Sequence, residues 1–304
     1  MRGAFPNRVS EPKNPLRTIL CVHQKPAIKT LPPILVAHLL GTIDRLLVKL
    51  LRSLETEQFK LRAVKDWTVH DVAAHLLDTQ LRKLSLVRDK HFGLPAPEIR
   101  SNDDVVAFID RLNAEGVAYY KRLSPQVLIS LLEVAGKENA AFHESLDPMA
   151  DATFPVSWAG ESTSKNWFDT ARELTERWHH QQQIRETVGN PGIMTRKLYH
   201  PVLDCFLRGL PHHYRDISQP DGTGLKVTIA GECGGTWCVV RDGGQWQLTS
   251  SVIGRPAAEI AVPQEIAWRI FTKGIAHADA EPRCVITGDR ELASHLLTLT
   301  AIVG

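Results

Sequence analysis

Several features that would assign a protein to a class are missing from this sequence. It has no apolar run of the roughly 18 residues that a membrane-spanning helix needs. Its longest apolar segments, residues 34–40 and 296–303, are amphipathic or too short. An excess of charge is missing too, because 36 basic and 34 acidic residues leave a formal net charge of +2. We therefore expect neither a membrane nor a nucleic acid as a partner.

Cysteine is also scarce. The five cysteines are scattered along the chain, and no two of them form a C-x-x-C pair. This pattern predicts neither a disulfide framework nor a zinc ribbon. Reduced, unpaired cysteines are typical of the cytoplasm, which is the compartment that we expect.

The length and composition indicate two globular domains. The chain has 304 residues, of which 43% are hydrophobic and 23% charged, as in an ordinary globular protein. Residues 1–31 are set apart from the rest, because this stretch is basic, contains four prolines and shows no sustained hydrophobic period. We predict that residues 1–31 form a disordered extension.

Hydrophobic periodicity divides the remaining chain into a helical part and a mixed part. Helices are predicted at residues 32–53, 68–90, 101–123, 125–146 (with a possible break), 171–186 and 195–213. From about residue 216 the period changes to that of strands, predicted at residues 225–229, 236–241, 245–250, 258–262 and 284–287. Two more helices are expected at residues 264–273 and 290–303. The sequence thus predicts a helical domain at residues 32–215, followed by a small α+β domain at residues 216–304.

The helix at residues 171–186 carries the chemistry that we consider most informative. Glu176 and His180 are four residues apart, so their side chains lie on one face of the helix and can contact one cation. Two ligands are too few, and His75 on an earlier helix is the best candidate for the third. A solvated ion pair on a helix surface is the alternative interpretation of Glu176 and His180.

Chance alone accounts for such spacings. With thirteen histidines, about 1.5 acid–histidine pairs four residues apart are expected at random, and the chain has four: Asp66–His70, Asp71–His75, Glu176–His180 and Glu291–His295. The spacing by itself therefore indicates a metal only weakly. Further evidence has to come from the residues around these pairs.

Two segments resemble a known family. They are Trp67-x-x-x-Asp71-x-x-x-His75-Leu76 and Glu176-x-Trp178-x-His180-x-x-x-Ile184. They are similar to the signature segments of the DinB-like superfamily, and more closely to its mycothiol-dependent maleylpyruvate isomerase branch. The loop at residues 155–160 is similar as well. In the second half, residues 231–237, 268–274 and 286–289 resemble a sterol-carrier-protein-like domain, so the likeness spans about residues 32–304.

The resemblance implies a four-helix bundle that binds a divalent metal, most often zinc, through His75, Glu176 and His180. It also implies a low-molecular-weight thiol such as mycothiol as cosubstrate. The thiolate adds to the double bond of maleylpyruvate, rotation follows, and elimination gives the trans isomer. S-transfer to another small electrophile, or hydrolysis, is an alternative reaction at the same site. The family commonly has an aspartate where Gln183 stands, which puts any substrate-binding role of that position in doubt.

Two further expectations concern the substrate and the assembly. Arg241, at the end of a predicted strand, is a candidate for binding a substrate carboxylate, although a surface arginine beside a hairpin turn is the alternative. A second hypothesis for the whole chain is a non-catalytic protein whose C-terminal domain binds an apolar ligand and whose metal site is structural or vestigial. We expect a monomer or a homodimer. Trp67, Trp158 and Trp178 are expected to pack in the core or in the wall of the site, and His70, His179 and His295 to be exposed.

Overall fold

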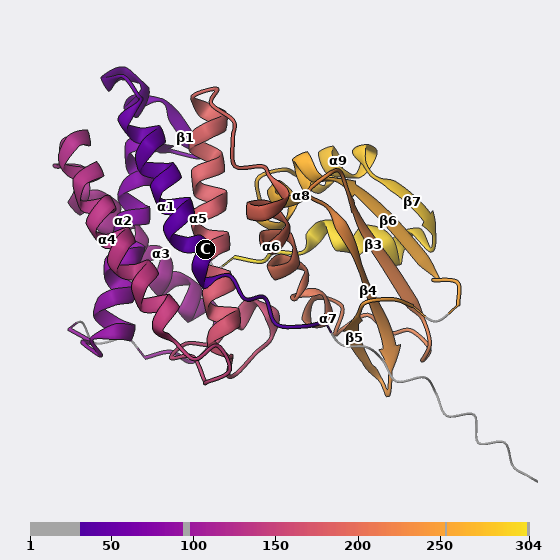
Figure 1. The fold of residues 1–304 in the computed structure, drawn as a ribbon. Helices are drawn as coiled ribbons and strands as arrows, with labels where there is room; N and C mark the ends of the chain where they lie inside the picture. The colour runs from indigo at the N-terminus through magenta and orange to yellow at the C-terminus, as the bar shows by residue number, and fades with distance from the viewer. Residues whose placement is uncertain (1–30, 94–97, 253, 303–304) are drawn as a thin grey trace, which may run out of the picture.

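The computed structural model describes residues 31–93, 98–252 and 254–302. A helical half at the N-terminal side is followed by an α+β half built around a five-stranded sheet (Figure 1). This order confirms the predicted fold class. The predicted disordered extension, apart from Leu31, lies outside the described residues.

Four long helices form a bundle. They are α1 (Ala37–Arg52), α2 (Val69–Lys83), α4 (Pro125–Ser145) and α5 (Asn166–Thr187). Each packs against two of the others, in the closed order α1, α4, α2, α5. The helix α3 (Asn102–Tyr120) packs on the outside of α2. The bundle therefore has four interfaces between neighbouring helices. The interface between α2 and α5 is the one that holds the candidate site.

Side-chain caps start three of these helices at the residues that the sequence indicates. The Thr68 hydroxyl accepts from the backbone N–H of Asp71, whose carboxylate accepts from the backbone N–H of Thr68, so both orphan donors are satisfied. Ser101 and Asp104 form the same capping box before α3. Ser124 caps α4, with Pro125 in its first turn, where a missing N–H costs little.

Some helix boundaries differ from the prediction. The helix α1 begins at Ala37 rather than at Pro32, and residues 31–36 have no regular secondary structure. The helix α2 ends at Lys83 and continues as one π-turn, Leu84–Arg88. No break interrupts α4. A short antiparallel hairpin, β1 (Arg62–Val64) with β2 (Trp67–Thr68), was not predicted.

Two shorter helices connect the halves. They are α6 (Arg196–Leu207), which packs on α5, and α7 (Leu210–His213). The long connection between α4 and α5 is irregular, as expected, apart from a 3-10 turn at Ser157–Ala159 that packs against α7. Gly160 has a φ of +81° and lies against His212, so a larger residue there meets both a strained backbone and a clash.

The second half is a twisted sheet in the strand order β5-β4-β3-β6-β7. The strands are β3 (Gly224–Ala230), β4 (Gly235–Asp242), β5 (Gln245–Thr249), β6 (Ala258–Pro263) and β7 (Val285–Gly288). Neighbours pair antiparallel except β3 and β6, which are parallel. The helices of this half are α8 (Gln264–Phe271), α9 (His277–Ala280) and α10 (Arg290–Ser294). The C-terminal helix is thus shorter than predicted, and α9 was not predicted.

The apolar core has two parts. One cluster joins α1, α2 and α4 within the bundle, and α5 contributes only Ile184 to it. The other is larger and continuous from α1 and α5 through α6 into the sheet and its helices. The two halves of the chain therefore share a core across the predicted boundary near residue 216.

Candidate metal centre

His75 is positioned by the start of α2. The capped first turn fixes the helix beside β2, and His75 follows the Thr68 cap by two turns. Its side chain is 3% exposed, and the ring of Trp67 lies against it with the centroids 5.1 Å apart. Trp67 therefore forms part of the wall of the site, as the sequence predicts.

Glu176 and His180 face His75 from α5. One oxygen of the Glu176 carboxylate, Oε1, lies 2.9 Å from Nε2 of His75 and 3.2 Å from Nε2 of His180. One donor atom from each of the three residues lies within 4.8 Å of the others. Within the described chain, this is the group of three histidine, cysteine or acidic side chains close enough to bind one ion. The structure thus brings together the three residues that the sequence singled out.

The outer nitrogens of the two histidines differ in their surroundings. Nδ1 of His180 lies 2.8 Å from Oε1 of Gln183. An amide oxygen only accepts, so Nδ1 of His180 donates to it, and Nε2 is the nitrogen that faces Glu176. Nδ1 of His75 is buried and has no hydrogen-bond partner among the described residues. Gln183 therefore orients the His180 ring through Nδ1, whereas Nδ1 of His75 has no such partner among the described residues.

The electrostatics favour a neutral histidine beside an ionised carboxylate. Burial lowers the pKa of His75, and its hydrogen bond to Glu176 offsets this only in part. Burial acts to raise the pKa of Glu176, but the charge and hydrogen bond of His180 and the hydrogen bond of His75 outweigh it and hold that pKa well below its usual value. Glu176 is thus an anion at neutral pH, beside a His75 whose burial favours its uncharged form.

His179 is buried, contrary to the prediction. Its Nδ1 lies 2.9 Å from the backbone oxygen of Thr175, and its ring centroid is 3.9 Å from that of His180. Burial, with the nearby His180, lowers the pKa of His179 to about 3. The prediction assumed a solvent face on α5, but α1, α2 and α6 all pack on this helix. His70 and His295 are partly buried rather than fully exposed.

Trp178 anchors the other side of α5. It is fully buried, and its indole N–H donates to the backbone oxygen of Ile193. Its ring stacks on Tyr199 of α6 at 4.2 Å and meets Trp268 of α8 edge-on at 6.0 Å. The tryptophan between the two α5 donors is therefore a packing residue, as the sequence predicts, and it joins α5 to the second half.

Arg241 does not join the three donors. It lies at the end of β4, next to the hairpin turn, with its guanidinium 5.9 Å from the centroid of the Trp246 ring. No contact between Arg241 and His75, Glu176 or His180 is found among the described residues. Its role in binding a substrate carboxylate, like that of Gln183, stays a prediction.

The donor set suits a divalent metal. As metal ligands, two uncharged imidazoles and one carboxylate would carry a single negative charge. Their three donor atoms come from two helices and lie within 4.8 Å of one another. Such a set, two histidines and one glutamate, occurs in zinc enzymes that keep a fourth position open. The residues present therefore fit the metal that the resemblance implies.

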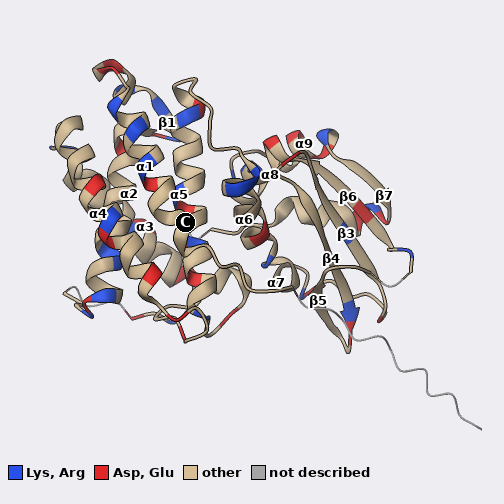
Figure 2. Cartoon of the chain, in the orientation of Figure 1, with Lys and Arg blue, Asp and Glu red and all other residues tan. Residues whose placement is uncertain are grey.

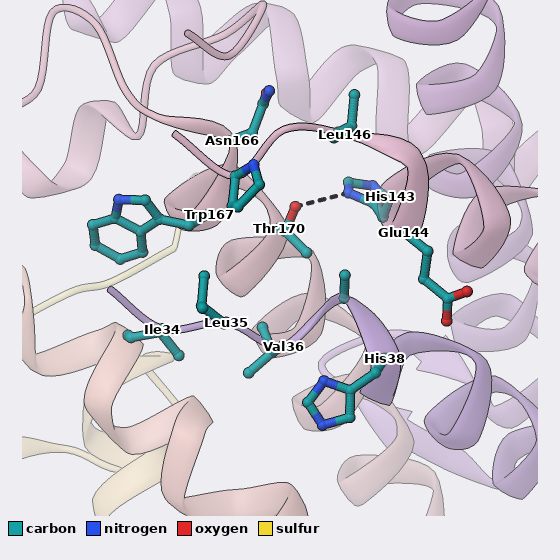
Figure 3. A pocket seen from close by; sticks show the side chains of 12 residues that line it. Ile34, Leu35, Val36, His38, His143, Glu144, Leu146, Asn166, Trp167 and Thr170 are labelled. Carbon is teal, nitrogen blue, oxygen red and sulfur yellow. Dashed lines mark hydrogen bonds between the residues drawn. The ribbon is translucent and has the colours of Figure 1, made fainter. Parts of the chain in front are cut away.

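Elsewhere in the described part of the chain, no second group of three such side chains is found. Lysine and arginine alternate with acidic residues over both halves of the chain (Figure 2). A hollow of about 300 Å³ lies at the opposite end of the bundle, between the start of α1, the end of α4 and the start of α5 (Figure 3). Its wall is mostly apolar, and His143 and Thr170 are hydrogen-bonded to each other there. A smaller hollow of about 220 Å³ lies beside Trp167, between Leu31 and Leu248. None of the described helices is long and apolar enough to cross a membrane.

Comparison with known proteins was made on the sequence and on the fold. The family model described as the mycothiol maleylpyruvate isomerase N-terminal domain matches residues 40–185. A crystal structure of the mycothiol-dependent maleylpyruvate isomerase is 13% identical with a TM-score of 0.47, and the match covers 79% of this chain and 91% of that one. A mutant of that enzyme gives the same identity and coverage with a TM-score of 0.46.

A more remote match is the stereoselective inverting sec-alkylsulfatase Pisa1 from Pseudomonas sp., with 12% identity, a TM-score of 0.24, and coverage of 91% of this chain and 54% of that one. No curated protein matches the chain. The family match includes all three donor residues of the site. Residues 40–185 of this chain are thus similar to the mycothiol maleylpyruvate isomerase N-terminal domain.

Proposed function

We propose that His75, Glu176 and His180 bind one divalent metal ion, and that the protein is a metal-dependent enzyme that uses a low-molecular-weight thiol. The observation that carries the proposal is the convergence of the two Nε2 atoms on one Glu176 oxygen, at 2.9 and 3.2 Å. Two helices that are a hundred residues apart in sequence present these donors to each other. An accidental surface ion pair between neighbours on one helix does not have this property.

Zinc is the metal that we favour. Imidazole nitrogen and carboxylate oxygen are common zinc ligands, and three protein ligands are typical of catalytic rather than structural zinc. Zinc in such a site supplies a positive charge that favours the ionised form of a thiol, whose pKa is otherwise about 8.5. The chain's own part is to hold two uncharged imidazoles and one carboxylate in place, with Trp67 shielding one side.

The reaction that we propose is a cis–trans isomerisation of the maleylpyruvate type. The similarity of residues 40–185 to the family model supports it. The thiolate sulfur adds to one carbon of the double bond, rotation follows about the resulting single bond, and elimination restores the double bond and the thiolate. Transfer of the thiol to another small electrophile is the alternative at the same site. The substrate roles of Arg241 and Gln183 remain part of this proposal.

Metal analysis is the direct test. Purified protein should contain close to one divalent metal ion per chain by elemental analysis, and His180→Ala should lose it while keeping its helical circular dichroism. His70→Ala is the control, because His70 lies on α2 but its ring bonds the backbone oxygen of Leu123 instead of facing the site. Wild-type protein that binds no added zinc would rule out the metal centre.

The reaction has its own test. Thiol-dependent loss of maleylpyruvate absorbance should be seen with one of mycothiol, bacillithiol or glutathione, and should disappear in His75→Ala. A metal-loaded protein that is inactive with all three thiols would reject the isomerase and leave transfer to another electrophile.

A binding protein without catalysis is the second hypothesis that the sequence raised. It needs an apolar cavity in the second half of the chain, which we also propose to be sterol-carrier-protein-like. Of the two hollows described above, one lies at an end of the bundle and the other beside Trp167, where Leu248 of β5 lines it. We favour the enzyme because three candidate ligands lie together, and in it the second half supports α5 through Trp178 and Trp268.

A further inference from the structure

The two helices that carry the metal donors share little apolar contact. The buried apolar residues of α2 belong to one core cluster, most of whose other members lie on α1 and α4. On α5, Phe168, Ala171, Leu174 and Trp178 belong to the other cluster, and of the described α5 residues only Ile184 reaches the core of α2. Apolar packing therefore leaves the position of α2 relative to α5 weakly determined.

Buried ion pairs join the two helices instead. Nζ of Lys83 on α2 lies 2.7 Å from Oδ2 of Asp169 and 3.1 Å from Oε1 of Glu173, both on α5. The side chains of Lys83 and Asp169 are 6% and 2% exposed. Asp169 also pairs with Arg172. Although burial acts to raise the pKa of Asp169, these cations lower it to about 2, so the ion pair persists at neutral pH.

Lys83 lies on the same face of α2 as His75. The two are eight residues apart, which is close to two helical turns and about 12 Å along the axis. Asp169 and Glu176 are seven residues apart on α5, which runs antiparallel to α2 along this face because His75 meets Glu176 and Lys83 meets Asp169. The pair of helices is thus held at two points, the donor cluster and the Lys83 ion pairs.

We propose that Lys83 is a positioning residue, whose ion pairs with Asp169 and Glu173 set the register of α2 against α5 and thereby the placement of His75 relative to Glu176 and His180. This inference rests on the proposed metal function. A slide of one residue along α2 moves His75 by about 1.5 Å, whereas zinc ligands have to stay within about 0.2 Å of their distances. Buried ion pairs break when they are displaced, whereas apolar contacts tolerate small shifts.

The test removes both members of the Lys83–Asp169 ion pair together. Lys83→Met/Asp169→Asn takes away one charge of each sign, and Glu173 keeps Arg177 and Arg172 at 3.9 and 4.0 Å. Leu128→Ala is the control for lost stability, because Leu128 is buried in the core cluster of α2 but lies on α4. Lys83→Met alone removes a cation from beside the buried Asp169 carboxylate. We expect it to be the least stable of the three variants.

Two measurements separate the outcomes. By competition with a chelator, the double variant should bind zinc at least about tenfold more weakly than wild type, while Leu128→Ala stays within twofold. In metal-free protein, the ring signals of His75 and His180 by nuclear magnetic resonance should shift or broaden in the double variant and remain single and unshifted in Leu128→Ala. Unchanged signals and affinity in a folded double variant would overturn the role of Lys83. If wild-type protein does not bind zinc, only the proposed metal function is rejected. The His75 and His180 ring signals of metal-free protein still test whether Lys83 sets the register of α2 against α5.

Discussion

At the scale of single residues, the hydrogen bond between Gln183 and His180 sets the orientation of the His180 ring. The Gln183 oxygen accepts from Nδ1 of His180, so Nε2 is the nitrogen that faces Glu176. A carboxylate at position 183 can accept the same hydrogen bond but adds a negative charge to the centre. The neutral Gln183 amide can therefore orient His180 without adding a negative charge beside the three candidate ligands.

Loss of this hydrogen bond should weaken metal binding. Gln183→Leu has a similar volume but no acceptor, and we expect its zinc affinity to fall about 10- to 100-fold, as for other partners of metal-bound histidines. Gln183→Glu keeps the acceptor and should stay close to wild type. Competition with a chelator measures both, and equal affinities of the Leu variant and wild type would contradict the role.

At the scale of the elements, each donor depends on how its helix starts and what surrounds it. The capping box of Thr68 and Asp71 places the first turn of α2, two turns before His75.

His143 on α4 is a buried polar residue whose hydrogen-bonding capacity is only partly used. It is 2% exposed, and its Nε2 has no hydrogen-bond partner among the described residues.

Removal of the α2 cap should destabilise the bundle. Thr68→Ala leaves the N–H of Asp71 without its acceptor, and the free energy of unfolding should fall by about 1 kcal/mol. Chemical denaturation monitored by circular dichroism measures it. Ser101→Ala is the matched control, because it removes the same kind of box from α3, which packs only on the outside of α2. If the denaturation midpoint of Thr68→Ala equals that of wild type, tertiary contacts alone stabilise the first turn of α2.

The stability of the protein should fall in mild acid, in part because of His143. Burial, together with the charges of Lys83 and Arg177, lowers the pKa of His143 to about 4, although Glu173 acts to raise it. Between pH 6.5 and 4 the unfolded chain therefore binds a proton that the folded chain does not, so the free energy of unfolding falls as the pH is lowered. This one group contributes at most about 1.4 kcal/mol per pH unit.

Replacement of His143 should remove that contribution. In His143→Asn the free energy of unfolding should depend less steeply on pH between 6.5 and 4.5, as measured by denaturation at several pH values. Leu128→Ala should lower the whole curve without changing its slope. Identical slopes in His143→Asn and wild type would show that this histidine is not the group involved.

At the scale of the whole molecule, the two halves are joined through the helix that carries two of the donors. Trp178 stacks on Tyr199, whose hydroxyl donates to the backbone oxygen of Gln264 and accepts from the backbone N–H of Trp268. An ion pair between Glu186 and Arg269 links the end of α5 to α8 at the surface. One apolar cluster runs through this junction into the sheet.

Truncation of a buried side chain at this junction should therefore also destabilise the bundle. Trp268 is 1% exposed, and Trp268→Ala should cost about 3–5 kcal/mol of stability. Hydrogen exchange should become faster in α5 as well as in the sheet, because the core is shared. Faster exchange confined to residues 224–302 would instead show two independent folding units.

Much of this fold is readable from local patterns. The leucines of α1, the caps of α2, α3 and α4, and the turn at residues 242–244 each act within a few residues, so their elements were predicted. The hairpin of β1 and β2 was missed because strands of three and two residues are too short to show a period. The early end of the C-terminal helix was missed because apolar residues 296–299 continue the helical pattern although the chain there forms a 3-10 turn.

The sequence by itself indicated a helical half followed by an α+β half, and it singled out His75, Glu176 and His180 as candidate metal ligands. It did so because periodicity, capping and the segments around His75 and His180 are local properties of the chain. Only the tertiary structure decided that Nε2 of His75 and Nε2 of His180 meet one Glu176 oxygen, that His179 is buried, and that Arg241 lies away from them. It also revealed that Lys83 pairs with Asp169 across the same helix pair. These facts depend on how α2 and α5 pack, and contacts between residues a hundred positions apart leave no trace in a local pattern.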